Sequence, residues 1–530
     1  MEVAHMTINS MIYKLRNDAN ISQEKFASLF GVSRQSVQKW ESGASVPEID
    51  KIIKIAKYFG ISIDTLVLDS NSRAMEEYAA AKEIKPNFDK IDSWEPYSSD
   101  LMTEFEQSVE EGLDIERYKD VFSAVSALPK DEVKKKFGDV LYDIVSNAKQ
   151  AVGYKYIEPS ALDEIKALRK EHSFSQTIPD GETLKNKIHG AWMGRVCGCL
   201  LGKPVEGIRT DELIPLLKES GNYPMHRYIY STDITEKMCD RYNFHLRNKP
   251  YADTVKGMPV DDDTNYVVLA QKIIEDCGRD FTSYDVSKAW LKYQSMESYF
   301  TAERVAFRNF VNGYEPPQSA SYKNPYREWI GAQIRGDYFG YINPGDPETA
   351  ADMAFRDACI SHVKNGIYGE MFAAAMISCA AVTDDISDII LGGLAQIPHT
   401  SRLHEAISDV LEGYGSGICQ ADCFKRIHTL FDEHTGHGWC HAISNAMIVA
   451  ASLLYGGGDF GKSICMAVEA GFDTDCNGAT VGSILGMRNG IENIGEIWTK
   501  PVEDTIHTSI FGEETVKISE CAQKTLEHMA

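Results

Sequence analysis

Two short clusters of acidic and polar residues could do chemistry in this chain. One is Asp261–Thr264 (DDDT) and the other is Asp473–Asn477 (DTDCN), and each comes directly before a segment with helical spacing of apolar residues. Adjacent carboxylates repel one another and resist burial unless a cation neutralises them, and hard divalent cations prefer oxygen ligands. Together the two clusters could therefore enclose one or two Mg²⁺ or Mn²⁺ ions.

Helix capping is the competing explanation for both clusters. Aspartate and threonine in the first turn of a helix accept hydrogen bonds from free backbone N–H groups and interact favourably with the helix dipole. For either cluster taken alone, capping is the preferred interpretation.

Two series of glycines at intervals of four form a third feature. They are Gly190, Gly194, Gly198 and Gly202, and then Gly478, Gly482 and Gly486. Small residues on one face of a helix allow close approach of another backbone, so packing accounts for both series. Packing does not require Glu206, which follows the first series in the sequence KPVEG. Glu206 is therefore a candidate catalytic or metal-linked group.

The elements that must position these residues are helices. Beyond Tyr154 the chain is dominated by long segments with helical spacing of apolar residues, for example 266–273 and 442–453, whereas strand-like alternation is scarce. We therefore expect an all-α protein, with a large and almost wholly helical domain.

The N-terminal segment from Ile8 to Leu66 has a different pattern. It predicts several short amphipathic helices that are separated by clear capping and helix-ending residues. Ser22 is expected to cap a helix that runs to about Phe30, Gly31 to end it, and Ser33 to cap the next helix. This order predicts a helix, a tight turn and a second helix. The exposed face of the second helix carries residue types that read base edges and phosphates, namely Arg34, Gln35, Ser36, Gln38 and Lys39.

Charge divides the 530 residues further. The whole chain has 54 Lys and Arg against 78 Asp and Glu, a net charge of −24, which argues against coating of nucleic acid by the whole surface. Residues 1–70 hold eight of each kind and are neutral. We therefore expect a small helix-turn-helix bundle at 1–70, an acidic helical linker or dimerisation region at 71–150, and the large domain at 151–530.

The chain shows no apolar run long enough to cross a bilayer, so we expect a cytoplasmic protein without membrane contacts. Its twelve cysteines begin only at Cys197 and contain no CxxC pair, which favours reduced thiols over a disulfide framework and argues against structural zinc.

The segment ISQEKFASLFGVSRQSVQKWESGASVPEIDKIIKIAKYFGISIDTL resembles the helix-turn-helix of Cro/repressor-type (XRE-like) regulators. The resemblance implies that Gln35, Ser36 and Gln38 face bases, and that Gln23, Arg34 and Lys39 lie near phosphates. It favours sequence-specific DNA binding by a dimer, since such heads read paired half-sites. A small helical bundle that docks on a protein is the alternative, and the neutral charge of the segment leaves it open.

From about Tyr154 to the C-terminus the chain resembles the ADP-ribosylglycohydrolase family, which includes the dinitrogenase-reductase-activating glycohydrolases. The resemblance rests on KIHGAWMGRVCGCLLGKPVEG, VDDDTNYVVLA, YINPGDPETAADMAFRDACISHVKNGIYGEMFAAAMISCA and LLYGGGDFGKSICMAVEAGFDTDCNGATVGSILG. It implies an all-helical fold with a two-metal centre, Mg²⁺ or alternatively Mn²⁺, at the base of a cleft for ADP-ribose.

The resemblance also implies roles for single residues. Those matching the metal ligands of the family are Asp262, Asp263, Asp473 and Asp475. Glu206 matches a glutamate that positions the ribose or the attacking water, and His362 matches a histidine that faces the substrate cleft.

Three positions depart from the family pattern. Asp261 stands where Ser or Thr is usual and adds a further oxygen ligand, and Cys476 stands where Thr is usual. Because a thiol suits Mg²⁺ poorly, Cys476 could leave coordination to water or favour Mn²⁺. Cys199 replaces an aspartate found in many members, and we expect it to lie farther from the ligands.

The chemistry that follows is hydrolysis at the anomeric carbon of ADP-ribose, released from an ADP-ribosylated protein or small molecule. A metal-bound water would attack, and Glu206 or a ligand aspartate such as Asp263 would take its proton. The runner-up is a transcription regulator whose large domain senses ADP-ribose or a related nucleotide without turnover. A third hypothesis assigns both domains to protein assembly.

Overall fold

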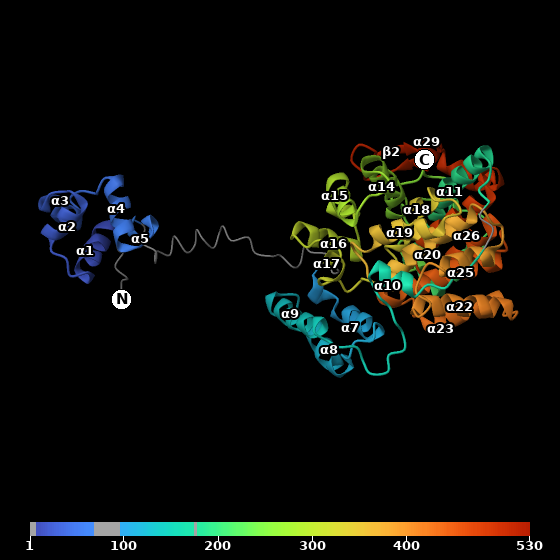
Figure 1. Cartoon of the computed structure of the whole chain (residues 1–530), viewed down its shortest axis with the longest axis horizontal. Coiled ribbons are helices and arrows are strands. Elements are labelled where there is room, and N and C mark those ends of the chain that lie inside the picture. Colours follow the sequence, from blue (N-terminus) through green and yellow to red (C-terminus); the bar gives the residue numbers. More distant parts are fainter. Residues whose placement is uncertain (1–6, 68–95, 174–176, 530) are drawn as a thin grey trace. The chain divides into compact units, whose positions relative to one another are not determined.

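The computed structural model describes residues 7–67, 96–173 and 177–529, and the chain divides into two compact units, Met1–Phe88 and Asp89–Ala530 (Figure 1). Helices make up almost all of the regular secondary structure in the described residues. The strands in these residues are β1 (Thr505–His507) and β2 (Thr515–Lys517), an antiparallel pair in which Thr505 lies opposite Lys517. The prediction of an all-α protein is confirmed.

The first unit is a bundle of short helices. They are α1 (Ile8–Asp18), α2 (Gln23–Phe30), α3 (Arg34–Glu41), α4 (Ile49–Phe59) and α5 (Ile63–Val67). The hydroxyl of Ser22 accepts a hydrogen bond from the backbone N–H of Lys25, Gly31 ends α2 with a φ of 63°, and Ser33 caps α3. Phe26 and Val37 are fully buried between these helices. The predicted boundaries of the helix-turn-helix are confirmed.

Residues 97–148, which we call the arm, belong to the second unit. The arm contains α7 (Leu101–Glu110), α8 (Lys119–Ser126) and α9 (Glu132–Ser146), and Figure 1 shows these helices together at one edge of the unit. Leu101 and Phe122 are fully buried in a small core of its own. Ring contacts between Tyr142 and Tyr322 join α9 to the large helical body.

The large helical body follows the arm. Its helices are α10 (Leu162–Ala167), α11 (Gly181–Gly202), α12 (Thr210–Glu219), α13 (Glu236–Arg241), α14 (Asp262–Cys277), α15 (Ser283–Tyr293), α16 (Thr301–Val311), α17 (Gln318–Ser321), α18 (Asp337–Tyr341), α19 (Pro347–Ala358), α20 (Asn365–Ala380), α21 (Ile386–Leu394), α22 (Arg402–Gly415), α23 (Gln420–Leu430), α24 (Gly436–Cys440), α25 (Ala442–Gly456), α26 (Phe460–Glu469), α27 (Thr474–Asn489), α28 (Glu496–Thr499) and α29 (Ile518–Glu527). Within the described residues, no helix combines the length and the apolar character that crossing a bilayer requires.

Helices α11 and α27 pack backbone to backbone through their two glycine series. A Cβ atom on Gly194 would lie 2.1 Å from the carbonyl oxygen of Gly482, and one on Gly198 would lie 1.9 Å from that of Gly478. At the end of α11, a Cβ on Gly202 would lie 2.3 Å from the carbonyl oxygen of Thr474. The packing explanation of the glycines is confirmed, and this contact brings the end of α11 against the start of α27.

Replacement of Gly198 by Ala is expected to lower the free energy of unfolding by about 1–3 kcal/mol, the usual cost of overpacking a core. The added methyl would force the backbones of α11 and α27 apart. Urea unfolding followed by circular dichroism measures this change. Gly181→Ala in the same helix is the matched control, because a Cβ there would meet no atom within 4 Å. Equal effects of the two substitutions would show that the close approach is not needed.

Candidate active site and DNA-binding surface

The end of α11 and the starts of α14 and α27 meet at one cavity of about 380 Å³. Its floor is acidic. The polar residues on it are Lys203, Glu206, Asp261, Asp262, Asp473, Asp475 and Cys476. The fold thus brings together two clusters that are more than 200 residues apart in the sequence, with the carboxylate that follows the glycine helix beside them.

Capping accounts for only part of this floor. Asp261 is the N-cap of α14, and its Oδ1 accepts a hydrogen bond of 2.9 Å from the backbone N–H of Asp263. Asp473 holds the N-cap position of α27, but its side chain makes no cap hydrogen bond. Capping therefore does not explain why Asp473 and Asp475 face the cavity.

Asp263 lies behind the floor rather than on it. Its side chain is fully buried and is not among the residues lining the cavity. Arg195 of α11 donates hydrogen bonds of 2.8 Å to its Oδ1 and to its carbonyl oxygen, and a third of 2.8 Å to Asp337. Arg195 thereby fixes the start of α14. Sequence reasoning missed this residue, although it lies within the quoted glycine motif.

His362 is also fully buried and is absent from the cavity lining. Its Nδ1 lies 2.8 Å from the hydroxyl of Ser361, and its Nε2 lies 4.0 Å from Glu303, which does line the cavity. The structure thus places His362 one residue behind the wall. Its contact with substrate stays a prediction.

The expectation for Cys199 was wrong. Its Sγ lies with carboxylate oxygens of Asp261 and Asp263 in a group whose atoms are all within 4.8 Å of one another. The reason is the close packing of α11, which carries the last turn of that helix past the start of α14. Sequence distance from the acidic clusters gave no information about this approach.

The carboxylates of the floor are poised to bind a cation. Burial, followed by the charge of Glu206, raises the pKa of Asp473 to about 6, and burial also raises the pKa of Asp475 well above its usual value. A cation would reverse both effects. One oxygen of Asp263, Oδ2, is buried without a hydrogen-bond partner, and ligand atoms of Asp263, Asp475 and Cys476 lie within 4.8 Å of one another. These residues fit a divalent metal ion.

Lys203 is the counter-charge that sequence reasoning did not consider. Burial by itself disfavours its ammonium, but the charges of Asp261, Asp475 and Glu206 outweigh burial and raise the pKa of Lys203 above its ordinary value. The side chain therefore stays protonated on the cavity floor.

Three aromatic side chains lie on the walls of the cavity. Phe300, Trp329 and Trp439 line it, and the guanidinium of Arg209 lies over the ring of Trp439 at 4.7 Å from its centroid. Such rings offer stacking faces to a nucleotide-like ligand. Sequence reasoning missed these residues because they come from separate loops and helices with no shared spacing.

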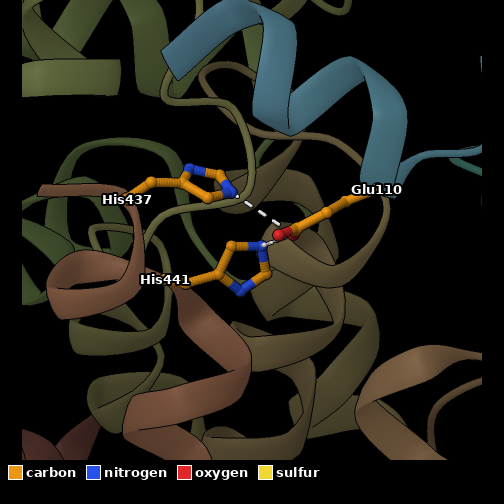
Figure 2. A group of neighbouring side chains, drawn as sticks. All are labelled: Glu110, His437 and His441. Carbon is orange, nitrogen blue, oxygen red and sulfur yellow. Dashed lines mark hydrogen bonds and ion pairs between the residues drawn. The ribbon is translucent and has the colours of Figure 1, made fainter. Parts of the chain in front are cut away.

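A second cluster with metal-ligand residue types lies where the arm meets α24. Figure 2 shows His437 and His441 pointing at Glu110 of α7, with their Nε2 atoms 3.3 Å and 3.6 Å from its carboxylate. The Nδ1 of His437 accepts a hydrogen bond from Trp329, and that of His441 accepts one from the backbone N–H of Ile443.

These acceptor roles of Nδ1 place the proton of each neutral ring on Nε2. A metal-ligating imidazole instead donates from its other nitrogen. Burial lowers the pKa of His441 to about 4, so that ring stays neutral. His437 therefore donates a hydrogen bond to Glu110, with Nε2 of His441 close by, and this contact joins the arm to the segment that carries Trp439 into the cavity.

On the helix-turn-helix, α3 presents most of the predicted DNA contacts to solvent. Arg34, Gln35, Gln38 and Lys39 are exposed, whereas Ser36 is half-buried, with its hydroxyl 2.9 Å from that of Ser33.

Gln23 stands apart from these residues. Its side-chain amide donates a hydrogen bond of 2.7 Å to Glu41, which also pairs with Arg16. One N–H of the Gln23 side chain is therefore used within the fold. The predicted phosphate contact would have to be made by the second N–H of the same amide.

Comparison with known proteins agrees with this architecture. The family model for ADP-ribosylglycohydrolase matches residues 180–528, and a helix-turn-helix model matches residues 12–66. The HTH-type transcriptional activator BcrR of Enterococcus faecalis is 30% identical over 86 residues, which cover 16% of this chain and 42% of BcrR. The cryptic phage CTXphi transcriptional repressor RstR of Vibrio cholerae is 32% identical over 69 residues, or 13% of this chain and 62% of RstR. The chain thus spans less than two thirds of either regulator.

A solved ADP-ribosylglycohydrolase-related protein complex is 18% identical, with a TM-score of 0.42, and the match covers 66% of this chain and all of that one. The family match takes in α11, α14 and α27, the helices that build the acidic floor. The chain belongs to the ADP-ribosylglycohydrolase family and joins that domain to an N-terminal helix-turn-helix.

Proposed function

We propose that the large domain hydrolyses the N- or O-glycosidic bond between ADP-ribose and a modified protein or small molecule, in a metal-dependent reaction. The observation that supports this proposal is the convergence of Glu206, Asp262, Asp473 and Asp475 on one cavity. A cavity of about 380 Å³ with an acidic floor and aromatic side chains on its walls suits a nucleotide-sized ligand that becomes cationic as it reacts.

Different residues of the cavity have different roles in the proposed hydrolysis. A divalent ion, Mg²⁺ or Mn²⁺, held by the floor carboxylates would make a bound water more acidic and orient ribose hydroxyls. Glu206 is 43% exposed, with Lys203 3.8 Å away, and would take a proton from the attacking water as the water oxygen bonds to C1 of the ribose; the leaving group would depart with a proton. The negative floor stabilises the positive charge that develops on the ribose as the bond to the leaving group breaks. Phe300, Trp329 and Trp439 exclude bulk water.

The test is release of free ADP-ribose from arginine- and serine-ADP-ribosylated peptides, with Mg²⁺, with Mn²⁺ and with EDTA. We expect release with a divalent ion and its loss in EDTA, restored by added metal. Both linkages belong in one assay, because the proposed attack at C1 of the ribose is common to them. Release that persists in EDTA would contradict metal dependence.

A second candidate function is that of a sensor. Two residues favour it. Asp261 is already used by its ion pair with Lys203 and by its cap hydrogen bond at α14, and Cys476 places a thiol on the floor. In that case the large domain binds ADP-ribose without turnover and alters DNA affinity. Tight binding of ADP-ribose with no release from either peptide would favour this sensor over the hydrolase.

We propose further that the first unit binds specific DNA as a dimer through α3. Gln38→Ala is expected to weaken binding to the selected sequence by about 1–3 kcal/mol, because Gln38 is exposed where base edges are read. Lys39→Ala is expected to weaken binding to all sequences and to lower the salt slope by about one unit.

Fluorescence anisotropy with an oligonucleotide enriched from a random pool, at several salt concentrations, measures both effects. The control is Lys57→Ala on α4, which removes the same charge from an exposed site outside α3. Losses equal to that of the control, or no enriched sequence at all, would favour the protein-docking alternative.

A further inference from the structure

Lys203 occupies the centre of the acidic floor. It follows the last residue of α11 and opens the short turn η4 (Lys203–Val205), and its side chain is 20% exposed. The Nζ atom contacts Oδ2 of Asp261 and lies 3.8 Å from Glu206 and 4.0 Å from Asp475. One ammonium group is thus surrounded by carboxylates from three segments of the chain.

We propose that this ammonium is a built-in cation, which takes one of the two cation positions of the floor, so that the cavity binds a single divalent ion. The inference rests on the proposed metal-dependent function and specifies its metal content. Asp261, a predicted metal ligand, then serves as the counter-ion of Lys203.

The backbone around Lys203 keeps the ammonium in place. Gly202 is pressed against α27, where a Cβ on it would lie 2.3 Å from the carbonyl oxygen of Thr474. The residue before Lys203 therefore cannot shift toward α27, and the Asp261 carboxylate is held by its cap bond to Asp263. Both partners of the ion pair are anchored by packing.

A divalent ion bound to the same carboxylates would lie close to the ammonium. Mg²⁺ binds oxygen at about 2.0–2.1 Å, so an ion bound to Oδ2 of Asp261 would lie close to Nζ, which already contacts that oxygen. Like charges at that spacing exclude each other on a partly dry surface. The ammonium already supplies one positive charge beside the carboxylates of Asp261, Glu206 and Asp475.

One position remains for a metal ion. Oδ2 of the fully buried Asp263 has no hydrogen-bond partner, and a ligand atom of Asp475 and the Sγ of Cys476 lie near it. Asp473 adds a further carboxylate on the cavity side. Arg195 pairs with Oδ1 of Asp263, which leaves Oδ2 for a metal ion.

The test counts Mn²⁺ ions bound to the full chain without substrate, by electron paramagnetic resonance and by calorimetry. We expect one ion per wild-type chain, two per Lys203→Met chain, and one per Lys203→Arg chain, which keeps the cation. Thermal melting checks that each variant is folded.

Two ions on the wild-type chain would overturn the inference without any variant, and so would an unchanged single ion on a folded Lys203→Met chain. Absence of Mn²⁺ binding would overturn it as well. The ADP-ribose release assay judges the hydrolase separately, because a chain that takes up two ions and still releases ADP-ribose refutes only the role of Lys203.

Discussion

Asp475→Asn is expected to lower kcat/KM for ADP-ribose release by about 10³-fold, because a bound metal supplies several kcal/mol to the transition state and each 1.4 kcal/mol is about tenfold in rate. Asparagine keeps the shape of the side chain. It removes the negative charge that faces both the metal position and Lys203.

The measurement is initial-rate release of ADP-ribose at saturating Mn²⁺, together with Mn²⁺ affinity for the same preparation. The matched control is Asp163→Asn, at an exposed aspartate of α10 that does not line the cavity. We expect the control to retain full activity, and both variants to melt as the wild type does. A loss for Asp475→Asn no greater than that of the control would remove this carboxylate from the proposed site.

Arg327→Met is expected to lower the free energy of unfolding of the second unit by about 3–5 kcal/mol, the usual cost of breaking a buried ion pair on one side. The guanidinium donates to Glu104 at 2.8 Å and to Glu111 at 2.6 Å, and both carboxylates are buried. Its removal leaves the buried carboxylate of Glu104 without its cation, whereas Glu111 keeps Lys364 at 2.8 Å.

Urea unfolding of the full chain, followed by near-ultraviolet circular dichroism, reports on the second unit. Arg117→Met is the control, since Arg117 pairs with Asp114 at 3.4 Å while 67% exposed, and such surface pairs contribute about 0–1 kcal/mol. Adding Glu104→Gln to Arg327→Met is expected to restore part of the stability, because Glu104 is the carboxylate that Arg327→Met leaves without its cation. A loss as small as that of Arg117→Met would place the arm outside the cooperative unit.

The arm contacts also continue into the wall of the cavity. Arg327 is followed by Glu328, which pairs with Arg402, and then by Trp329, which lines the cavity. On the other side, Glu110 accepts a hydrogen bond from His437 at the start of the segment that carries Trp439 (Figure 2). The arm precedes the region matched by the family model. It thus supports the two segments that carry Trp329 and Trp439.

Local features of the sequence were sufficient for the helices and their ends. Ser22, Gly31 and Ser33 act on the backbone within three or four residues, so the helix-turn-helix boundaries follow from sequence order. The two glycine series likewise predict a close contact between helices. Residue type and spacing offered Glu206 and the two acidic clusters as candidates, and the family resemblance assigned them to one site.

The tertiary structure decided which of these residues act together. Capping and metal binding require the same residue types at the start of a helix, so the sequence could not separate them for Asp261 or Asp473. The packing of α11 on α27 separates them, because it places Lys203 on Asp261 and leaves Asp473 and Asp475 facing the cavity. Ion pairs such as Arg195 with Asp263 join residues 68 positions apart, and only the closed fold brings such charges within reach.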